Sequence, residues 1–122
     1  MLRVSVIQIN VSDMDVAIDF YCNTLGFAVR SREAYPNVVV LEDPGMTFLL
    51  YRVEKPTKID YPNVAQTLVN FETTNLVASL DKLRRKGVDF IHSTPQACPV
   101  GVYAAFRDPF GNVHELLEFQ RK

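Results

Sequence analysis

The chain of 122 residues repeats one order of structural signals, and this repetition limits the fold more than any other feature. Gly26 and Gly87 lie 61 positions apart, as do Ala17 and Ala78, and 61 is half of the chain length. In each half a β-branched apolar segment precedes a helical pattern that ends at the glycine, and short strand-like segments follow. Chance is the alternative explanation, because helix, glycine and strand is a common order. The repetition favours two copies of one β-α-β-β-β module.

The connector between the halves defines the module boundaries. Residues 54–64 are charged, contain two prolines and show neither a helical nor a strand pattern. Asp-Pro turns at Asp43 and Asp108 precede the last strand-like segment of each half, which supports duplication over chance. We therefore predict an α+β chain with module 1 at residues 1–53, a linker, and module 2 at residues 65–122.

Periodicity and capping signals predict the elements of each module. Ser12 or Asp13 is the expected N-cap of the first helix, and Thr73 or Thr74 that of the second. The second helix is expected to carry its apolar side chains at Leu76, Val77, Leu80 and Leu83. The expected strands are residues 2–11, 27–32, 37–42, 46–53, 65–71 and 88–91, part of 100–107, and 113–119.

Alternation along these strands predicts which side chains face away from the helices. Successive side chains point to opposite faces, so Ile7, Ile9 and Val11 are expected to pack against the first helix. On the opposite, inner face the expected ligand-binding residues are Val6, Gln8, Asn10, Leu49, Tyr51, Gln66, Asn70, Glu115 and Leu117. An apolar surface with a few polar groups is typical of a small-molecule pocket and also of an imperfect core. Glutamine and glutamate would lack partners in a dry core, which favours the pocket.

Composition excludes several other classes of protein. With 13 Lys and Arg against 14 Asp and Glu, the net charge of -1 provides no strong field for nucleic acid. The apolar runs are far shorter than the ~20 residues of a membrane helix, so we expect no membrane partner. The two cysteines have no metal-ligand spacing, and the first residues do not have the pattern of a signal peptide. We therefore expect a cytoplasmic protein with free thiols.

Three segments resemble the vicinal oxygen chelate superfamily, namely Val11–Tyr21, Leu25–Phe27 and Phe106–Leu116. This superfamily contains glyoxalase I, bleomycin-resistance proteins, fosfomycin-resistance enzymes, methylmalonyl-CoA epimerase and extradiol dioxygenases. The resemblance implies paired βαβββ modules that form a cupped, eight-stranded mixed sheet with the helices on its outer face. It also implies a homodimer.

The resemblance places four metal-ligand positions on Val6, Leu49, Gln66 and Glu115 of this chain. Aliphatic side chains at two of the four positions donate no electron pair, and Zn²⁺ or Fe²⁺ requires three or four N, O or S ligands. We therefore expect no metal and no cofactor.

The two histidines offer no replacement ligand for this site. His114 follows the opposite face of the strand from Glu115, and His92 lies near a strand end, so both are expected to be structural or solvated. For Arg107 two placements are open, a pair with Asp108 or a position in the cleft.

The resulting functional hypothesis is a metal-free homodimer that binds a small, largely apolar molecule in the sheet cleft. The alternative is a small-molecule lyase, isomerase or dioxygenase of the same superfamily, with Glu115 as the catalytic acid or base or as a metal ligand. A substitution of Glu115 by glutamine distinguishes the two hypotheses, because it abolishes turnover in the enzyme and leaves binding of a neutral ligand within roughly tenfold.

Overall fold

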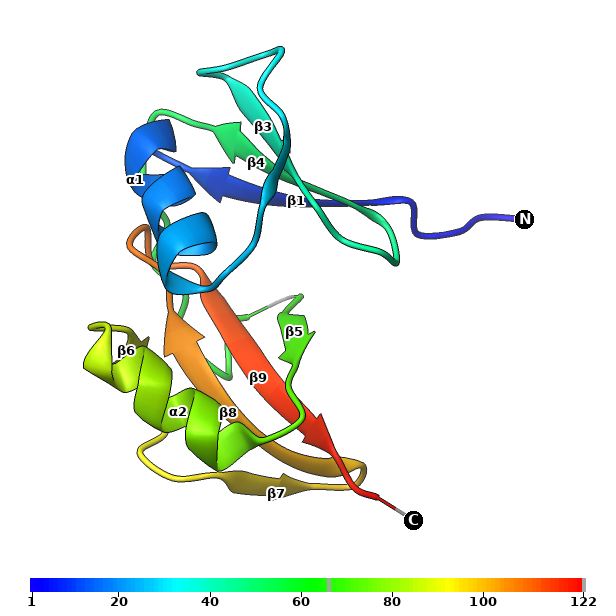
Figure 1. The fold of residues 1–122 in the computed structure, drawn as a ribbon, viewed down its shortest axis with the longest axis vertical. Coiled ribbons are helices and arrows are strands. Elements are labelled where there is room, and N and C mark those ends of the chain that lie inside the picture. The colour runs from blue at the N-terminus through cyan, green and yellow to red at the C-terminus, as the bar shows by residue number, and fades with distance from the viewer. Residues whose placement is uncertain (66, 122) are drawn as a thin grey trace. The chain divides into compact units, whose positions relative to one another are not determined.

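The structure is a computed structural model that describes residues 1–65 and 67–121. Gln66, one of the predicted inner-face residues, lies outside the described residues. Contacts within the chain divide it into two compact units, residues 1–57 (unit 1) and residues 58–122 (unit 2). Each unit has a sheet and a helix of its own (Figure 1).

Unit 1 contains a four-stranded sheet in the order β1-β4-β3-β2. Its strands are β1 (Val6–Val11), β2 (Val29–Ser31), β3 (Val38–Leu41) and β4 (Thr47–Arg52). β1 runs parallel to β4, and the other neighbours are antiparallel. The predicted first strand began at residue 2, whereas β1 begins at Val6, because its partner β4 begins opposite this residue at Thr47.

The helical part of unit 1 changes its winding along its length. Asp13 is the N-cap of α1 (Met14–Ile18) and accepts a hydrogen bond from the Val16 N–H at 3.1 Å, as one of the two predicted caps. The chain continues as a π-helix over Asp19–Thr24. Gly26 follows with a φ of 96°, a conformation that ends the helix where the pattern predicted.

The core of unit 1 lies between α1 and one face of the sheet. Ile9 and Val11 are buried there, while Gln8 and Asn10 on the other face of β1 are exposed, which confirms the predicted alternation. Tyr21 is fully buried, and its ring packs edge-on against Phe48 of β4 at 6.3 Å between centroids.

Unit 2 repeats the strand order of unit 1 as β5-β9-β8-β6, with β7 as an additional partner of β8. Its strands are β5 (Val69–Glu72), β6 (Asp89–Phe90), β7 (Gln96–Cys98), β8 (Gly101–Arg107) and β9 (Val113–Phe119). β7 was not predicted, because Pro95 and Pro99 flank this segment and argue against a strand. An outer strand tolerates prolines at its ends, since few of its N–H groups are needed for pairing.

The helix of unit 2, α2 (Leu76–Arg85), begins at a different cap from the predicted one. Asn75 is the N-cap and accepts from the Ala78 N–H at 3.0 Å, so the prediction of Thr73 or Thr74 is wrong. Glu118 of β9 accepts from the Leu76 N–H at 2.7 Å, which fixes the start of the helix from the sheet. The Thr73 hydroxyl instead bonds the Ser79 hydroxyl at 2.6 Å. A contact with a distant strand therefore decides the cap.

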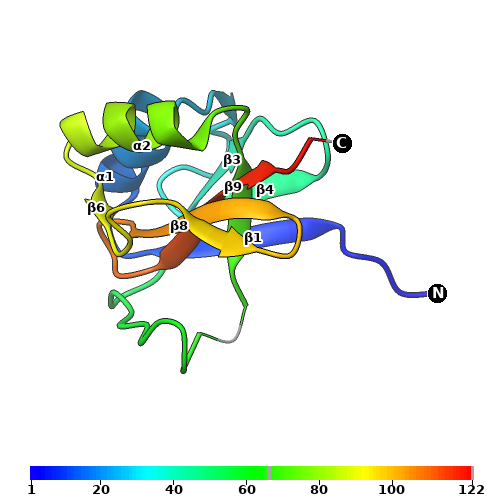
Figure 2. The same ribbon diagram turned by 90° about the horizontal axis from the view of Figure 1, so that it is seen from below.

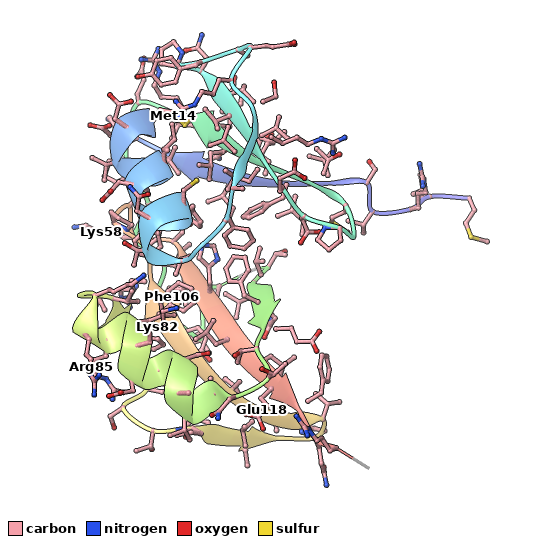
Figure 3. All side chains as sticks on the ribbon, in the orientation of Figure 1. Met14, Lys58, Lys82, Arg85, Phe106 and Glu118 are labelled. Atoms are coloured by element: carbon pink, nitrogen blue, oxygen red, sulfur yellow. The ribbon has the colours of Figure 1, made fainter. Side chains whose placement is uncertain are left out.

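One face of α2 packs on the sheet of unit 2 (Figure 2). Leu76, Leu80 and Leu83 are buried at helical spacing, as predicted. Val77 was expected among them, but its side chain is 67% exposed because it follows Leu76 by about a quarter turn. Phe106 of β8 is fully buried in this core (Figure 3).

The two Asp-Pro turns are stabilised by the same type of hydrogen bond, from backbone N–H groups to the aspartate carboxylate. Asp43 Oδ2 accepts from the backbone N–H groups of Gly45 and Met46 at 2.9 and 3.0 Å. Asp108 Oδ1 accepts from Phe110 and Asn112 at 2.9 and 2.8 Å. Each carboxylate thus binds donors that the turn leaves without backbone partners.

The predicted α+β class is confirmed by the mixed sheets and the helices, with one strand more in unit 2 than predicted. In the part of the chain that the structure describes, every helix is too short or too polar to cross a membrane.

Candidate binding site

The predicted site residues of unit 1 share one face of its sheet. Gln8 of β1 lies opposite Leu49 of β4, and Asn10 lies opposite Tyr51. Val6 follows on the same face by alternation and is exposed. The Gln8 Nε2 donates to Asn10 Oδ1 at 2.9 Å, so the two polar groups bind each other. This face offers two amides and one phenol among aliphatic side chains.

The predicted site residues of unit 2 that the structure describes also share one face. Asn70 of β5 lies opposite Glu115 of β9, and Leu117 follows Glu115 on the same side. The antiparallel register with β8 pairs Ala105 with Glu115 and Tyr103 with Leu117. Asn70, Glu115, Leu117 and Tyr103 therefore surround one patch of the sheet, on the face away from α2.

Glu115 is held by a residue that the sequence analysis did not select. The Tyr61 hydroxyl donates to Glu115 Oε2 at 2.6 Å, and both residues are half-buried. Burial raises the pKa of Tyr61, and the hydrogen bond and negative charge of Glu115 raise it further. The Tyr61 hydroxyl therefore stays protonated at neutral pH and acts as a donor.

Two further aromatic residues interact with Tyr61. The His92 ring lies edge-on to Tyr61 and to Tyr103, with centroids 5.8 and 5.4 Å apart. His92 Nδ1 accepts a hydrogen bond from the Ala105 N–H at 3.0 Å, so a neutral imidazole carries its proton on Nε2. His92 is thus tied to the backbone of β8, which is the structural alternative of the two that the sequence left open.

Arg107 belongs to the same face as Glu115 and holds the segment that carries Tyr61. Its Nη1 donates to the carbonyl oxygen of Ile59 at 3.0 Å. We call the group of Tyr61, His92, Tyr103 and Glu115 the tyrosine-glutamate cluster. Arg107 thus anchors the backbone at Ile59, two residues before Tyr61.

His114 occupies the opposite face of β9, as alternation predicted. Its side chain is 3% exposed and packs against Phe71 and Phe106, with ring centroids 5.3 and 5.6 Å apart. Burial lowers the pKa of His114 to about 4, although the nearby Asp108 carboxylate acts in the other direction. His114 is therefore a neutral core residue at pH 7.

Each unit has a hollow on its surface, and only the hollow of unit 1 is lined by a predicted site residue. In unit 1 a hollow of about 470 Å³ is lined by Ser12, Asn37, Tyr51, Arg52, Val53 and Glu54, of which Tyr51 belongs to the predicted set. In unit 2 a hollow of about 550 Å³ lies between α2 and residues 93–95. Its lining contains none of the predicted site residues, because it opens on the helix side of the sheet.

Sequence signals for the tyrosine-glutamate cluster were unequal. The position of Tyr103 could have been predicted, because the Asp108 turn sets the register of β8 against β9 and places Tyr103 beside Leu117. Tyr61 gave no periodic signal, since it lies in the charged segment before β5. Its contact with Glu115 joins residues 54 positions apart.

Comparisons with known proteins agree on one family. Residues 3–116 match the sequence model of the Glyoxalase/Bleomycin resistance protein/Dioxygenase superfamily. The chain belongs to this superfamily. An uncharacterised protein of Shewanella frigidimarina is 31% identical over 126 aligned positions, which cover 95% of this chain and 93% of that protein.

Solved structures of other proteins resemble the chain over nearly its whole length. TnmS3, an antibiotic binding protein from Streptomyces sp. CB03234, is 26% identical with a TM-score of 0.72 and coverage of 98% of both chains. A superfamily member from Sphaerobacter thermophilus is also 26% identical, with a TM-score of 0.73 and coverage of 97% and 98%. These matches confirm the resemblance seen in the sequence.

The donor set of this glyoxalase-superfamily chain does not fit a catalytic metal. Val6 and Leu49, at two of the four positions that the resemblance assigns to ligands, carry no donor atom. Glu115 directs one carboxylate oxygen to the Tyr61 hydroxyl. Over residues 1–65 and 67–121, no group of three or more His, Cys, Asp or Glu side chains is arranged to hold a metal ion.

Proposed function

We propose that this protein binds a small, largely apolar molecule without a metal ion, on the sheet faces that carry the predicted site residues. The observation that carries the proposal is the pair formed by Glu115 and Tyr61. A carboxylate at a ligand position of the superfamily binds a protein hydroxyl at 2.6 Å, and two other ligand positions are aliphatic. These residues can orient a ligand by hydrogen bonds and apolar contact.

The antibiotic binding protein TnmS3 supports this proposal by analogy. It is 26% identical to this chain and is described as an antibiotic binding protein. We extend the binding role, and not the identity of the ligand, to this chain. Within the proposal the protein is a cytoplasmic homodimer, and light scattering of the purified protein tests the dimer.

A binding experiment with anilinonaphthalene sulfonate, a fluorescent and largely apolar probe, tests the proposal. We expect saturable binding that is unchanged by a chelator. Leu49→Glu places a charge on the face of unit 1, and we expect it to weaken binding at least about tenfold, since burial of a charge is costly. Val16→Glu is the matched control, because Val16 is an exposed apolar residue of α1 in the same unit and outside the predicted site.

Two outcomes contradict the proposal. One is equal loss of probe binding in Leu49→Glu and Val16→Glu. The other is a tightly held ion at one per chain when Ni²⁺, Zn²⁺, Fe²⁺ or Mn²⁺ is added stoichiometrically and elemental analysis follows. Such an ion supports the enzyme alternative, and Glu115→Gln then abolishes turnover instead of changing affinity.

A further inference from the structure

The Tyr61 side chain occupies the polar centre of the unit 2 face. Its hydroxyl donates to Glu115 Oε2 at 2.6 Å, and its ring lies edge-on to His92 with centroids 5.8 Å apart. A hydrogen bond from a phenol to a carboxylate is of the charge-assisted type, which is stronger than a bond between neutral groups. This part of the sheet therefore holds a phenol ring by the hydrogen bond to Glu115 and the edge-on contact with His92, and a hydrogen bond with Tyr103 adds to them.

The surroundings of the phenol come from several strands and are independent of Tyr61. Glu115 lies on β9 and Tyr103 on β8, and His92 is fixed to β8 through the Ala105 N–H at 3.0 Å. The acceptor and the bordering rings thus belong to the sheet of unit 2 or are bonded to it. We therefore expect these groups to stay in place when the Tyr61 side chain is removed.

The segment that carries Tyr61 is attached to the sheet by hydrogen bonds rather than by strand pairing. Residues 54–64 contain neither a helix nor a strand. Arg107 holds this segment at the Ile59 carbonyl at 3.0 Å, and the Val64 N–H bonds the Asp60 carbonyl within the segment at 2.8 Å. Neither bond involves the Tyr61 side chain, so rotation of this side chain breaks no strand pairing.

We propose that Tyr61 fills a subsite for a hydroxyaromatic ring, and that a phenolic ligand displaces it and donates the same hydrogen bond to Glu115. This inference rests on the proposed binding function and names the chemical class of the ligand. A phenol has both features that the subsite uses, a neutral O–H donor and a ring. An aromatic carboxylate lacks the donor at neutral pH and is repelled by the Glu115 charge.

Titration of the full chain with para-fluorophenol and para-fluoroanisole, followed by fluorine NMR, tests this inference. The two probes share a ring, but the anisole has no O–H donor. In Tyr61→Ala the competing side chain is absent, and we expect para-fluorophenol to bind about tenfold more tightly than it binds the wild type. In the same variant we expect para-fluoroanisole to bind at least about tenfold more weakly than the phenol.

Three further variants sharpen the test. Glu115→Gln in the Tyr61→Ala background removes the charged acceptor, and we expect the preference for the phenol to fall to about twofold or less. Tyr61→Phe keeps the ring in place and removes the competing donor, so its gain in phenol affinity should be smaller than that of Tyr61→Ala. Tyr35→Ala is the matched control, because Tyr35 also precedes a proline and donates to a carboxylate, that of Asp15, in unit 1. We expect it to leave phenol binding unchanged.

Equal affinity of the two probes for Tyr61→Ala overturns the inference, as does equal phenol affinity of Tyr61→Ala, Tyr61→Phe and the wild type. Equal gains in Tyr61→Ala and Tyr35→Ala also overturn it. These failures are separate from failure of the proposed function. If anilinonaphthalene sulfonate still binds at a site sensitive to Leu49→Glu, the binding function stands and only the phenol subsite is wrong.

Discussion

The two units have the same order of strands in the sheet but carry different side chains on the inner face. Unit 1 runs β1-β4-β3-β2 and unit 2 runs β5-β9-β8-β6, and an aspartate binds the turn N–H groups before β4 and before β9. By the offset of 66 between the two turns, Leu49 of unit 1 corresponds to Glu115 of unit 2. Turn and core residues thus maintain the scaffold, while residues on the face away from the helix differ without altering it.

The tyrosines of two Tyr-Pro dipeptides form the same type of hydrogen bond, but the two bonds differ in burial. Tyr35 donates to Asp15 at 2.5 Å, and Tyr61 donates to Glu115 at 2.6 Å. Tyr35 is 43% exposed and lies in a loop near the start of α1, whereas Tyr61 is half-buried against a strand. A pair in water contributes little, and a partly desolvated pair contributes more.

The largest expected difference between the units concerns their turns. Asp108 is 5% exposed, and its Oδ2 accepts a further bond from Asn112 Nδ2 at 2.9 Å, whereas Asp43 is half-buried. We expect Asp108→Ala to lower the free energy of unfolding by about 4 kcal/mol, because buried donors lose a charged acceptor. Asp43→Ala should cost about 1 kcal/mol. Urea unfolding measures both, and equal costs would show that the turns are equivalent in energy as well as in form.

Acid should destabilise unit 2 more than unit 1. Both histidines of the chain lie in unit 2, and His114 has a folded pKa of about 4 against 6.5 for the free group. The folded state therefore binds fewer protons than the unfolded state between these values. The stability that neutral His114 provides is complete above pH 6.5 and is lost as the pH falls to about 4, by up to about 3 kcal/mol.

Urea unfolding of the wild type and of His114→Leu at pH 7 and pH 4.5 measures this loss. In the variant the dependence on pH over this interval should shrink, because the titrating group is absent. Hydrogen exchange should show that amides of α2 lose protection on acidification before those of β1. If His114→Leu loses as much stability on acidification as the wild type, groups other than His114 cause the loss.

The smallest expected effect separates the two tyrosine pairs. Tyr61→Phe should lower the free energy of unfolding by about 1 kcal/mol, discounted for the partial exposure of the pair. Tyr35→Phe should leave it within experimental error, since its partner carboxylate is in contact with water. If thermal unfolding gives equal shifts for the two variants, burial of the Tyr61 pair contributes nothing to stability.

The elements and the faces of the strands were predictable from local signals. Periodicity indicated β8 and β9, and alternation placed Glu115 and His114 on opposite faces of β9. The Asp108 turn supplied the register between the two strands. These properties depend on residues a few positions apart, so a single sequence contains the information.

Features set by distant contacts were not predictable. Asn75 rather than Thr73 caps α2 because Glu118, more than forty positions later, binds the Leu76 N–H. β7 forms between prolines because β8 offers it a partner. Each outcome was one of several that the local sequence allows, and packing selected among them.

The sequence by itself determined the repeated module, the mixed apolar and polar inner face, and the aliphatic residues at two ligand positions of the superfamily. These follow from residue type and spacing along one chain. Only the tertiary structure decided that Tyr61 meets Glu115 and that His92 and Tyr103 border the pair. The reason is physical, because a hydrogen bond between a non-periodic segment and a strand depends on how the chain returns to the sheet, and no local pattern encodes that return.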